Sequence, residues 1–238
     1  MTSARKYAAE ALGTTILLVG VVGSGIMGER LSGGNIAIAL LANTIATGAT
    51  LVAIIPALGS ISGAHFNPAV TLAVAVKGGV AWTEVPGYLL AQMLGAFSGV
   101  AAAHVMFGES IFAASQHARA GAAQMFSEFV ATFGLLSVIW GCSRVRSDGT
   151  PFAVGAYITG AYWFTSSTSF ANPAVTLGRS VTNTFSGIRP SDVPGFIVAQ
   201  LVGALTATAL WAWLLPSLPK ATKEVIVSRA EKNTVHGK

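Results

Sequence analysis

The residues of this chain with the clearest chemical role lie in a short motif that occurs twice. The hexapeptide Asn-Pro-Ala-Val-Thr-Leu begins at Asn67 and again at Asn172, once in each half of the 238 residues. Asn is a favourable N-cap because its side-chain oxygen accepts from an unpaired backbone N–H, and Pro suits the first position of a helix. Each copy therefore predicts the start of a short helix. Two such starts within an apolar chain would direct two positive dipole ends at one place.

The composition indicates a membrane protein. Hydrophobic residues make up 53% of the chain and charged residues only 10%, whereas soluble domains carry about 25% charged residues. The stretches 68–77 and 173–182, which follow the two Asn residues, are too short to cross a bilayer, so we expect re-entrant half-helices there. Six other segments are apolar and mostly near the roughly 20 residues that span a bilayer: 8–27, 35–58, 85–107, 124–142, 152–167 and 193–215.

The two halves of the chain repeat one another beyond the hexapeptide. Glu10 and Glu128 open the first and fourth spans, and Gln92 and Gln200 lie at matching places in the third and sixth. Each half holds three spans and one half-helix, and because three is odd, the second half enters the membrane from the opposite side. We therefore expect an inverted repeat whose half-helices meet near the midplane. The chain is divided accordingly into a first repeat, a second repeat and a basic tail, at 1–115, 116–218 and 219–238.

Basic residues gather on one side of this six-span arrangement. Arg5, Lys6, Lys77 and the basic tail fall on the same side. The positive-inside rule then places both termini in the cytoplasm. The tail lacks interleaved aromatic residues, so we expect it to lie in solvent near anionic lipid and not to bind nucleic acid.

The motifs and their surroundings resemble a known family. The run Ser-Gly-Ala-His-Phe-Asn-Pro-Ala-Val-Thr at 62–71 and the second Asn-Pro-Ala at 172–174 are similar to the paired motifs of the aquaporin, or major intrinsic protein, family. The resemblance extends from Glu10 to about Pro216. It implies an all-α membrane protein with the aquaporin fold, in which six transmembrane helices surround two re-entrant half-helices. It also implies a homotetramer in the lipid bilayer with one pore per subunit, which conducts water or small neutral solutes and uses no cofactor.

The pore centre is expected at the two motifs. If both Asn amides donate to the oxygen of one water, its hydrogens point away and a continuous proton wire is broken. Segment 59–66, rich in Gly and Ser, and segment 165–171, rich in Ser and Thr, are expected to be non-helical and to offer carbonyl acceptors along one wall, while apolar spans form the other. The residues assigned to the pore centre are Asn67, Pro68, Ala69, Asn172, Pro173 and Ala174.

Glu10 and Glu128 have two possible roles. Carboxylates within a membrane often mark a proton or ion site, but the symmetric placement of this pair favours a structural role, in which each accepts hydrogen bonds from a re-entrant loop. His65 is likewise interpreted as a loop-supporting residue, although its chemistry also suits a pH-dependent gate. His104 and His117 lack the partner spacing of a metal site, so no metal is expected.

The main departure from the family's pattern is Val175, which stands where most members carry Arg after the second motif. Matching the family's constriction gives Thr47, Gly160, Ser169 and Val175, all uncharged and small or medium-sized. We therefore expect a wide, less polar constriction without a guanidinium. Arg179 lies one helical turn beyond Val175. There it either attracts anions to the vestibule or is a surface arginine paired with lipid or a carbonyl.

The sequence thus predicts a passive channel for small uncharged solutes. The filter residues resemble a bacterial branch of the family associated with arsenical permeation, so arsenite and methylated arsenicals are the leading solutes and the bacterial inner membrane is the expected location. One alternative is an ordinary water and glycerol channel, and another is an ion-coupled secondary transporter that would use Glu10 and Glu128. An enzyme is not predicted, because the sequence shows no nucleophile–base pair, metal cluster or phosphate loop.

Overall fold

Polar residues mark where several helices of this chain begin. Asn35, Asn67 and Asn172 each precede a helix, and each side chain accepts from a backbone N–H of the first turn. These caps satisfy donors that have no partner within the helix. Proline occupies the first turn of five α-helices, where its missing N–H has no role in the helical ladder.

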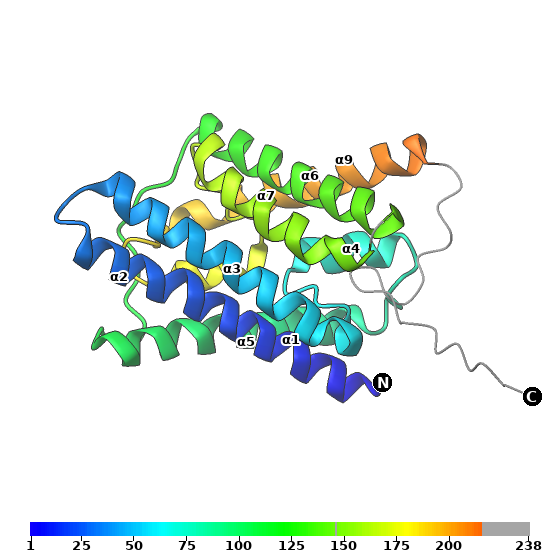
Figure 1. Cartoon of the computed structure of the whole chain (residues 1–238), viewed down its shortest axis with the longest axis horizontal. Helices are drawn as coiled ribbons and strands as arrows, with labels where there is room; N and C mark the ends of the chain where they lie inside the picture. The colour runs from blue at the N-terminus through cyan, green and yellow to red at the C-terminus, as the bar shows by residue number, and fades with distance from the viewer. Residues whose placement is uncertain (146, 216–238) are drawn as a thin grey trace, which may run out of the picture.

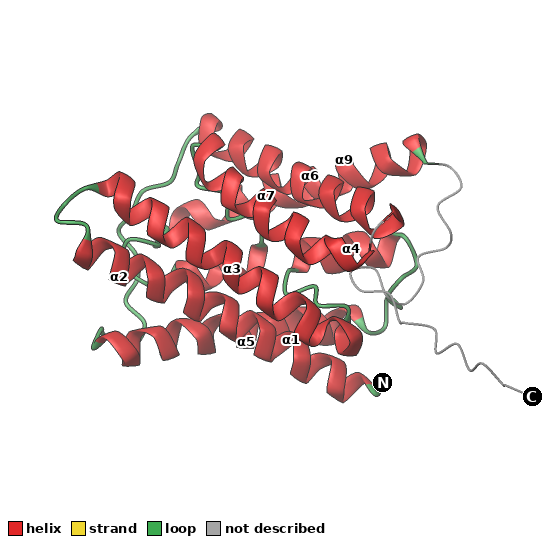
Figure 2. Ribbon diagram, in the orientation of Figure 1, coloured by secondary structure: helices red, strands yellow, loops and turns green. Residues whose placement is uncertain are grey.

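The computed structural model describes residues 1–145 and 147–215, and every regular element there is helical (Figures 1 and 2). The first span consists of α1, the π-helical turn η1 and α2, at Ser3–Leu18, Val19–Gly23 and Ser24–Leu31. The first half continues with α3 (Ile36–Ser62), α4 (Pro68–Val76) and α5 (Val85–Phe107). The second half contains α6 (Ala122–Val145), η2 (Ser147–Gly149), α7 (Thr150–Phe164), α8 (Pro173–Arg179), η3 (Pro190–Asp192) and α9 (Val193–Leu214).

Five helical segments of the described residues are long and apolar enough to cross a membrane. The predicted fifth span, α7, is shorter at 15 residues, and it packs against α3 and α6. Figure 1 shows α7 running alongside both helices, so it occupies the position of the fifth predicted span although it is shorter than the other five. The prediction of an all-α membrane fold is therefore confirmed. The N-terminus and the end of α9 lie toward the same end of the bundle, on the right in Figure 1.

Matching helices of the two halves pack in the same way. α1 packs against α5, and α6 packs against α9. A Cβ added at Gly95 would lie 2.4 Å from the Ala11 carbonyl oxygen, and one added at Gly203 would lie 2.5 Å from the Phe129 carbonyl oxygen. Glycine thus lets the backbones of each pair approach closely, which is a common basis of helix association in membranes. The equivalence of the two contacts supports the inverted repeat.

The short helices α4 and α8 contact each other inside the bundle. Each also packs against a long helix of the other half, α4 against α9 and α8 against α5. The two halves are therefore interlocked, because each half-helix is packed partly against a long helix of the other half.

Some boundaries differ from those predicted. α3 continues to Ser62, so the first non-helical loop begins at Gly63 and not at residue 59. Gly63 has a φ of 90°, a left-handed conformation that favours glycine. Its backbone N–H donates to the Gly59 carbonyl oxygen and so caps the helix. α4 ends at Val76 and α8 ends at Arg179, short of the predicted 77 and 182. After α8 the chain turns away, and the Ser180 hydroxyl donates to a carbonyl of the last turn at 2.7 Å. The predicted basic tail, 219–238, lies outside the described residues.

Candidate functional site

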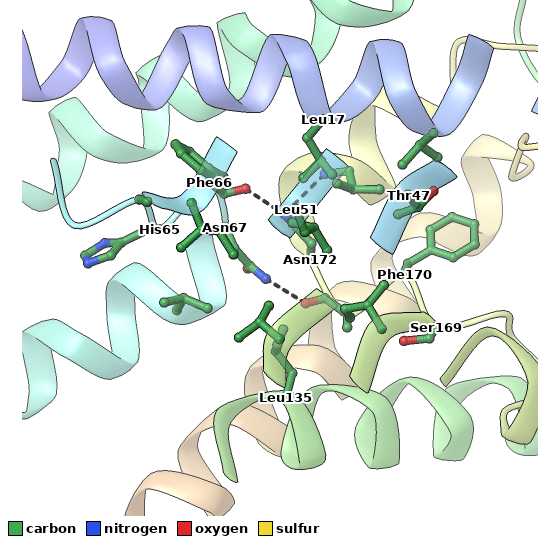
Figure 3. A pocket seen from close by; sticks show the side chains of 18 of the residues that line it. Leu17, Thr47, Leu51, His65, Phe66, Asn67, Leu135, Ser169, Phe170 and Asn172 are labelled. Carbon is green, nitrogen blue, oxygen red and sulfur yellow. Dashed lines mark hydrogen bonds between the residues drawn. The ribbon is translucent and has the colours of Figure 1, made fainter. Parts of the chain in front are cut away.

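The two Asn-Pro-Ala motifs face each other at the centre of the bundle. Asn67 Nδ2 donates to the Ala171 carbonyl oxygen at 2.7 Å, and Asn172 Nδ2 donates to the Phe66 carbonyl oxygen at 2.7 Å. Figure 3 shows both hydrogen bonds as dashed lines. Each Asn oxygen meanwhile accepts from a backbone N–H of its own half-helix at 2.9 Å. Because an amide group has two N–H donors, one donor of each side chain is left for the cavity that both residues line.

The loops that precede the half-helices have an unusual backbone. Ala64 and Phe66 in the first loop, and Ser169 and Ala171 in the second, have φ values between 49° and 51°. Residues other than glycine seldom adopt this left-handed conformation, and it persists where the surrounding structure imposes it. The same two positions carry it in each half, so the conformation belongs to the repeated unit.

A buried carboxylate holds each of these loops. Glu10 accepts from the backbone N–H groups of His65 and Phe66 at 2.9 and 2.7 Å. Glu128 accepts from two consecutive backbone N–H groups of the second loop, both at 2.9 Å. Both carboxylates are fully buried, and no ion pair involving either is found within 1–145 and 147–215. This geometry favours the loop-supporting role over a proton or ion site.

Gln and Thr side chains complete the support of each loop. The Gln92 amide donates to Glu10 at 2.8 Å and to the Thr71 hydroxyl at 2.9 Å. Gln200 makes the matching pair of bonds in the second half, at 2.6 and 2.8 Å. His65 Nδ1 lies 3.1 Å from the Thr71 hydroxyl. The His65 ring therefore belongs to this network, as the loop-supporting interpretation requires.

A cavity passes the paired Asn residues, and most of its wall is apolar. Its empty volume, including its open part, is about 630 Å³. Four spans each contribute two apolar residues that are four positions apart, so that each pair projects from one helix face. Sequence reasoning expected such a wall without naming its residues, and this spacing is the signal that identifies them. The pairs are Leu17 with Val21, Leu51 with Ile55, Leu135 with Ile139, and Val154 with Ile158.

Polar and aromatic side chains gather in one part of the cavity. The hydroxyl oxygens of Thr47 and Tyr162 lie 3.3 Å apart, and Cζ of Arg179 lies 3.4 Å from the centroid of the Phe170 ring. Ser169 lines the same cavity. Figure 3 shows Thr47, Ser169 and Phe170 on one side of the two Asn residues and His65 on the other. Sequence reasoning did not identify Tyr162 or Phe170.

Gly160, which was predicted in the filter, does not line the cavity. It is exposed, and a Cβ built there would meet only the Phe164 ring, at 3.8 Å. Tyr162 lies two residues further along α7, about 200° around the helix axis, and it lines the cavity. The prediction for Gly160 is therefore wrong. Packing against α3 and α6 fixes the rotation of α7, and matching a family position along the sequence does not reveal that rotation.

Arg179 is not a surface residue. Only 2% of it is exposed, and it lines the cavity together with Val175, which is 5% exposed. Its Nε donates to the Ser186 carbonyl oxygen. The surface position in the second alternative for Arg179 is therefore wrong, whereas the pairing with a carbonyl that the same alternative expected is found. The cavity wall therefore carries a guanidinium one helical turn beyond Val175.

Comparisons with known proteins extend over both halves of the chain. The sequence matches the family profile described as Major intrinsic protein at residues 1–164 and 147–237. A curated relative, the aquaglyceroporin AqpS of Rhizobium meliloti (strain 1021), is 54% identical over 216 residues, which cover 90% of this chain and 92% of the relative. A probable glycerol uptake facilitator protein of Thermotoga maritima is 29% identical over 235 residues, which cover 87% of this chain and 98% of the relative.

A solved structure has the same fold. The aquaglyceroporin from Plasmodium falciparum superposes with a TM-score of 0.70 at 20% sequence identity, covering 88% of this chain and 96% of that protein.

Proposed function

Since the chain belongs to the major intrinsic protein family, we propose that it carries arsenite and methylated arsenicals, in addition to glycerol and water, through the central cavity. The family and its aquaglyceroporin relatives make the chain a passive channel for small neutral solutes and not an enzyme. The proposed breadth of solutes rests on one observation, the branched apolar side chain of Val175 in the cavity wall directly after the second Asn-Pro-Ala.

The rest of the cavity suits passage without tight binding. The apolar pairs on four spans offer a solute no hydrogen bonds, while one free N–H of Asn67 and one of Asn172 offer donors at the centre. A water that accepts from both amides turns its hydrogens outward, so it cannot relay a proton between its neighbours. In this proposal neutral solutes pass and protons do not.

Solute flux in proteoliposomes tests the proposal. Stopped-flow permeabilities for water, glycerol, arsenous acid and a methylated arsenical are compared for the wild type, Val175→Arg and Val175→Leu. We expect Val175→Arg to lower the ratio of arsenical to water permeability, because the added side chain fills the cavity and places a further positive charge near Arg179 and Arg119, which both lie over the Phe170 ring. Val175→Leu, which adds volume without charge, separates the effect of size from that of charge. An unchanged ratio in Val175→Arg would show that residue 175 does not set solute breadth.

Wild-type fluxes also separate the alternatives. A channel that passes water and glycerol but excludes both arsenicals is an ordinary water and glycerol channel. Saturable flux that stops when the proton gradient is collapsed indicates an ion-coupled transporter. The first re-entrant loop already occupies both oxygens of Glu10, which argues against that transporter.

The proposal extends to assembly and location. We place a homotetramer in a bacterial inner membrane with both termini in the cytoplasm. Large apolar side chains exposed on several spans, such as Leu90, Leu94 and Val198, suit contact with lipid or a neighbouring subunit. Native mass spectrometry in detergent checks the tetramer, and protease access to an N-terminal tag in oriented vesicles checks the topology.

A further inference from the structure

Comparing the two halves of the repeat distinguishes the residues that support the re-entrant loops, which match, from cavity residues that differ. Glu10 and Glu128 match, as do the Gln and Thr side chains that brace each loop. Counted from the two Asn residues, four cavity positions of the second half do not match their counterparts in the first. Ser169 stands opposite Ala64, Phe170 opposite His65, Ala171 opposite Phe66, and Arg179 opposite Val74.

The difference at Arg179 is the largest in charge. Val74 is a buried residue of the apolar core, whereas Arg179 is a permanent cation, almost fully buried, in the wall of the cavity. A fold that needed this position only for packing would be served by a second apolar residue, as the first half is. A buried guanidinium is costly unless partners or a ligand satisfy it.

Arg179 and Ser169 retain unused hydrogen-bonding capacity. Nη1 of Arg179 and Oγ of Ser169 are both buried, and neither has a hydrogen-bond partner among the described residues. Both residues line the cavity. Unpaired buried polar groups are uncommon in folded proteins and call for a physical explanation. Two of them in one cavity wall are accounted for by a solute that supplies the missing partners.

The remaining contacts of Arg179 fix the side chain in place. The guanidinium stacks on the Phe170 ring, and Nε donates to the Ser186 carbonyl oxygen. The Ser186 hydroxyl in turn donates at 3.0 Å to the Val21 carbonyl oxygen, which belongs to the π-helical turn η1. The Asn43 amide donates to the same oxygen at 2.8 Å. Single π-helical turns are frequent at functional sites. Here the turn anchors the segment that holds the arginine.

We infer that Arg179 supplies the charge and hydrogen-bond donors of the selectivity filter that residue 175 lacks, with Ser169 as its polar neighbour. The site takes small hydroxylated solutes, whose oxygen atoms accept from Nη1 and exchange a hydrogen bond with Ser169. Because the guanidinium stays positively charged, it repels cations at the same point. Val175 leaves room beside it, so the channel combines a broad cavity with rejection of cations. This inference rests on the proposed channel function.

Charge removal and charge relocation test the inference in proteoliposomes. Arg179→Gln removes the charge, and the double variant Val175→Arg with Arg179→Gln moves it to the neighbouring turn. Arg189→Gln is the matched control, since Arg189 is an exposed arginine of the second half that does not line the cavity. The measurements are glycerol and water permeability and the ratio of sodium to chloride permeability, taken from the potential across a salt gradient.

We expect Arg179→Gln to raise the ratio of sodium to chloride permeability about tenfold or more, which corresponds to about 1.4 kcal/mol of lost repulsion. Its glycerol permeability should fall relative to water. The double variant should restore the low sodium ratio, and Arg189→Gln should match the wild type in both measurements. A folded Arg179→Gln channel with normal water flux and unchanged ion and glycerol ratios would overturn the inference.

Two further results keep the test decisive. If Arg179→Gln does not fold, the wild type alone is informative: sodium permeability at or below that of chloride supports the inference, and sodium permeability above that of chloride overturns it. Wild-type vesicles that pass glycerol no faster than empty vesicles would refute the channel function itself. That outcome differs from every outcome that bears on Arg179.

Discussion

Replacing Glu10 tests the assignment of the buried carboxylates most directly. One carboxylate oxygen accepts from the Ser62 hydroxyl at 2.6 Å and from the His65 N–H at 2.9 Å. The other accepts from the Phe66 N–H at 2.7 Å and from Gln92 at 2.8 Å. Glu10→Leu removes both acceptor oxygens, and with them all four hydrogen bonds, from a fully buried site. Glu10→Gln keeps one of the two oxygens and replaces the other with a donor.

The backbone donors determine the size of the effect. The side chains of Ser62 and Gln92 can turn to other partners, but the N–H groups of His65 and Phe66 cannot. Each buried donor left unpaired costs about 1–3 kcal/mol, so Glu10→Leu should lower the free energy of unfolding by about 2–6 kcal/mol. Glu10→Gln leaves one backbone N–H facing an NH₂ group, which costs about 1–3 kcal/mol. Small domains are stable by only about 5–15 kcal/mol, so the leucine variant is at risk of not folding.

Thermal unfolding in detergent, followed by tryptophan fluorescence, measures the stability of each variant, and stopped-flow glycerol flux per folded protein measures its function. We expect Glu10→Gln to unfold at a lower temperature and to conduct at a rate near that of the wild type. Glu128, which accepts from two backbone N–H groups and from Gln200, provides the matched test in the second half. A Glu10→Gln protein with wild-type thermal stability and no flux would refute the structural assignment and favour proton coupling.

Three further substitutions test other parts of the structure. Gly95→Ala should lower stability by about 1–3 kcal/mol through overpacking of the helix pair, whereas Gly160→Ala should leave thermal unfolding and flux unchanged; a loss of flux in Gly160→Ala would return that residue to the pore. Tyr162→Phe removes the hydroxyl next to Thr47 and should alter the ratio of glycerol to water permeability without loss of folded protein, so an unaltered ratio would exclude Tyr162 from the filter. Asn172→Asp keeps the helix cap but loses the amide donor, and it should reduce glycerol flux and raise cation entry; a variant with wild-type values in both measurements would contradict the assigned pore centre.

The repeated features were accessible from the sequence because each occurs twice. The hexapeptide identified both half-helices, and the matching carboxylates pointed to loop support, where Glu10 and Glu128 are found. Composition and segment length indicated the spans. Each of these inferences depends on local sequence alone or on a comparison between the two halves.

The filter was harder to predict because it depends on how helices rotate and where loops end. Gly160 and Tyr162 are two residues apart, and only the packing of α7 decides which of them reaches the cavity. Arg179 lies at the end of a half-helix, so its side chain could have turned to the surface or to the interior. The contacts with Phe170 and Ser186, which come from loops on either side of α8, direct it inward.

The crossed hydrogen bonds at the pore centre also bear on the order in which the chain assembles. Asn67 donates to the carbonyl of Ala171, more than one hundred residues later in synthesis. Until that residue has emerged, the first half-helix lacks the partner of its Asn amide, and α9, against which α4 packs, does not yet exist. Contacts between residues so distant along the chain form late in folding, because the intervening loop must close first. The conducting centre is therefore among the last parts of the molecule to form, and a nascent first half holds an incomplete pore.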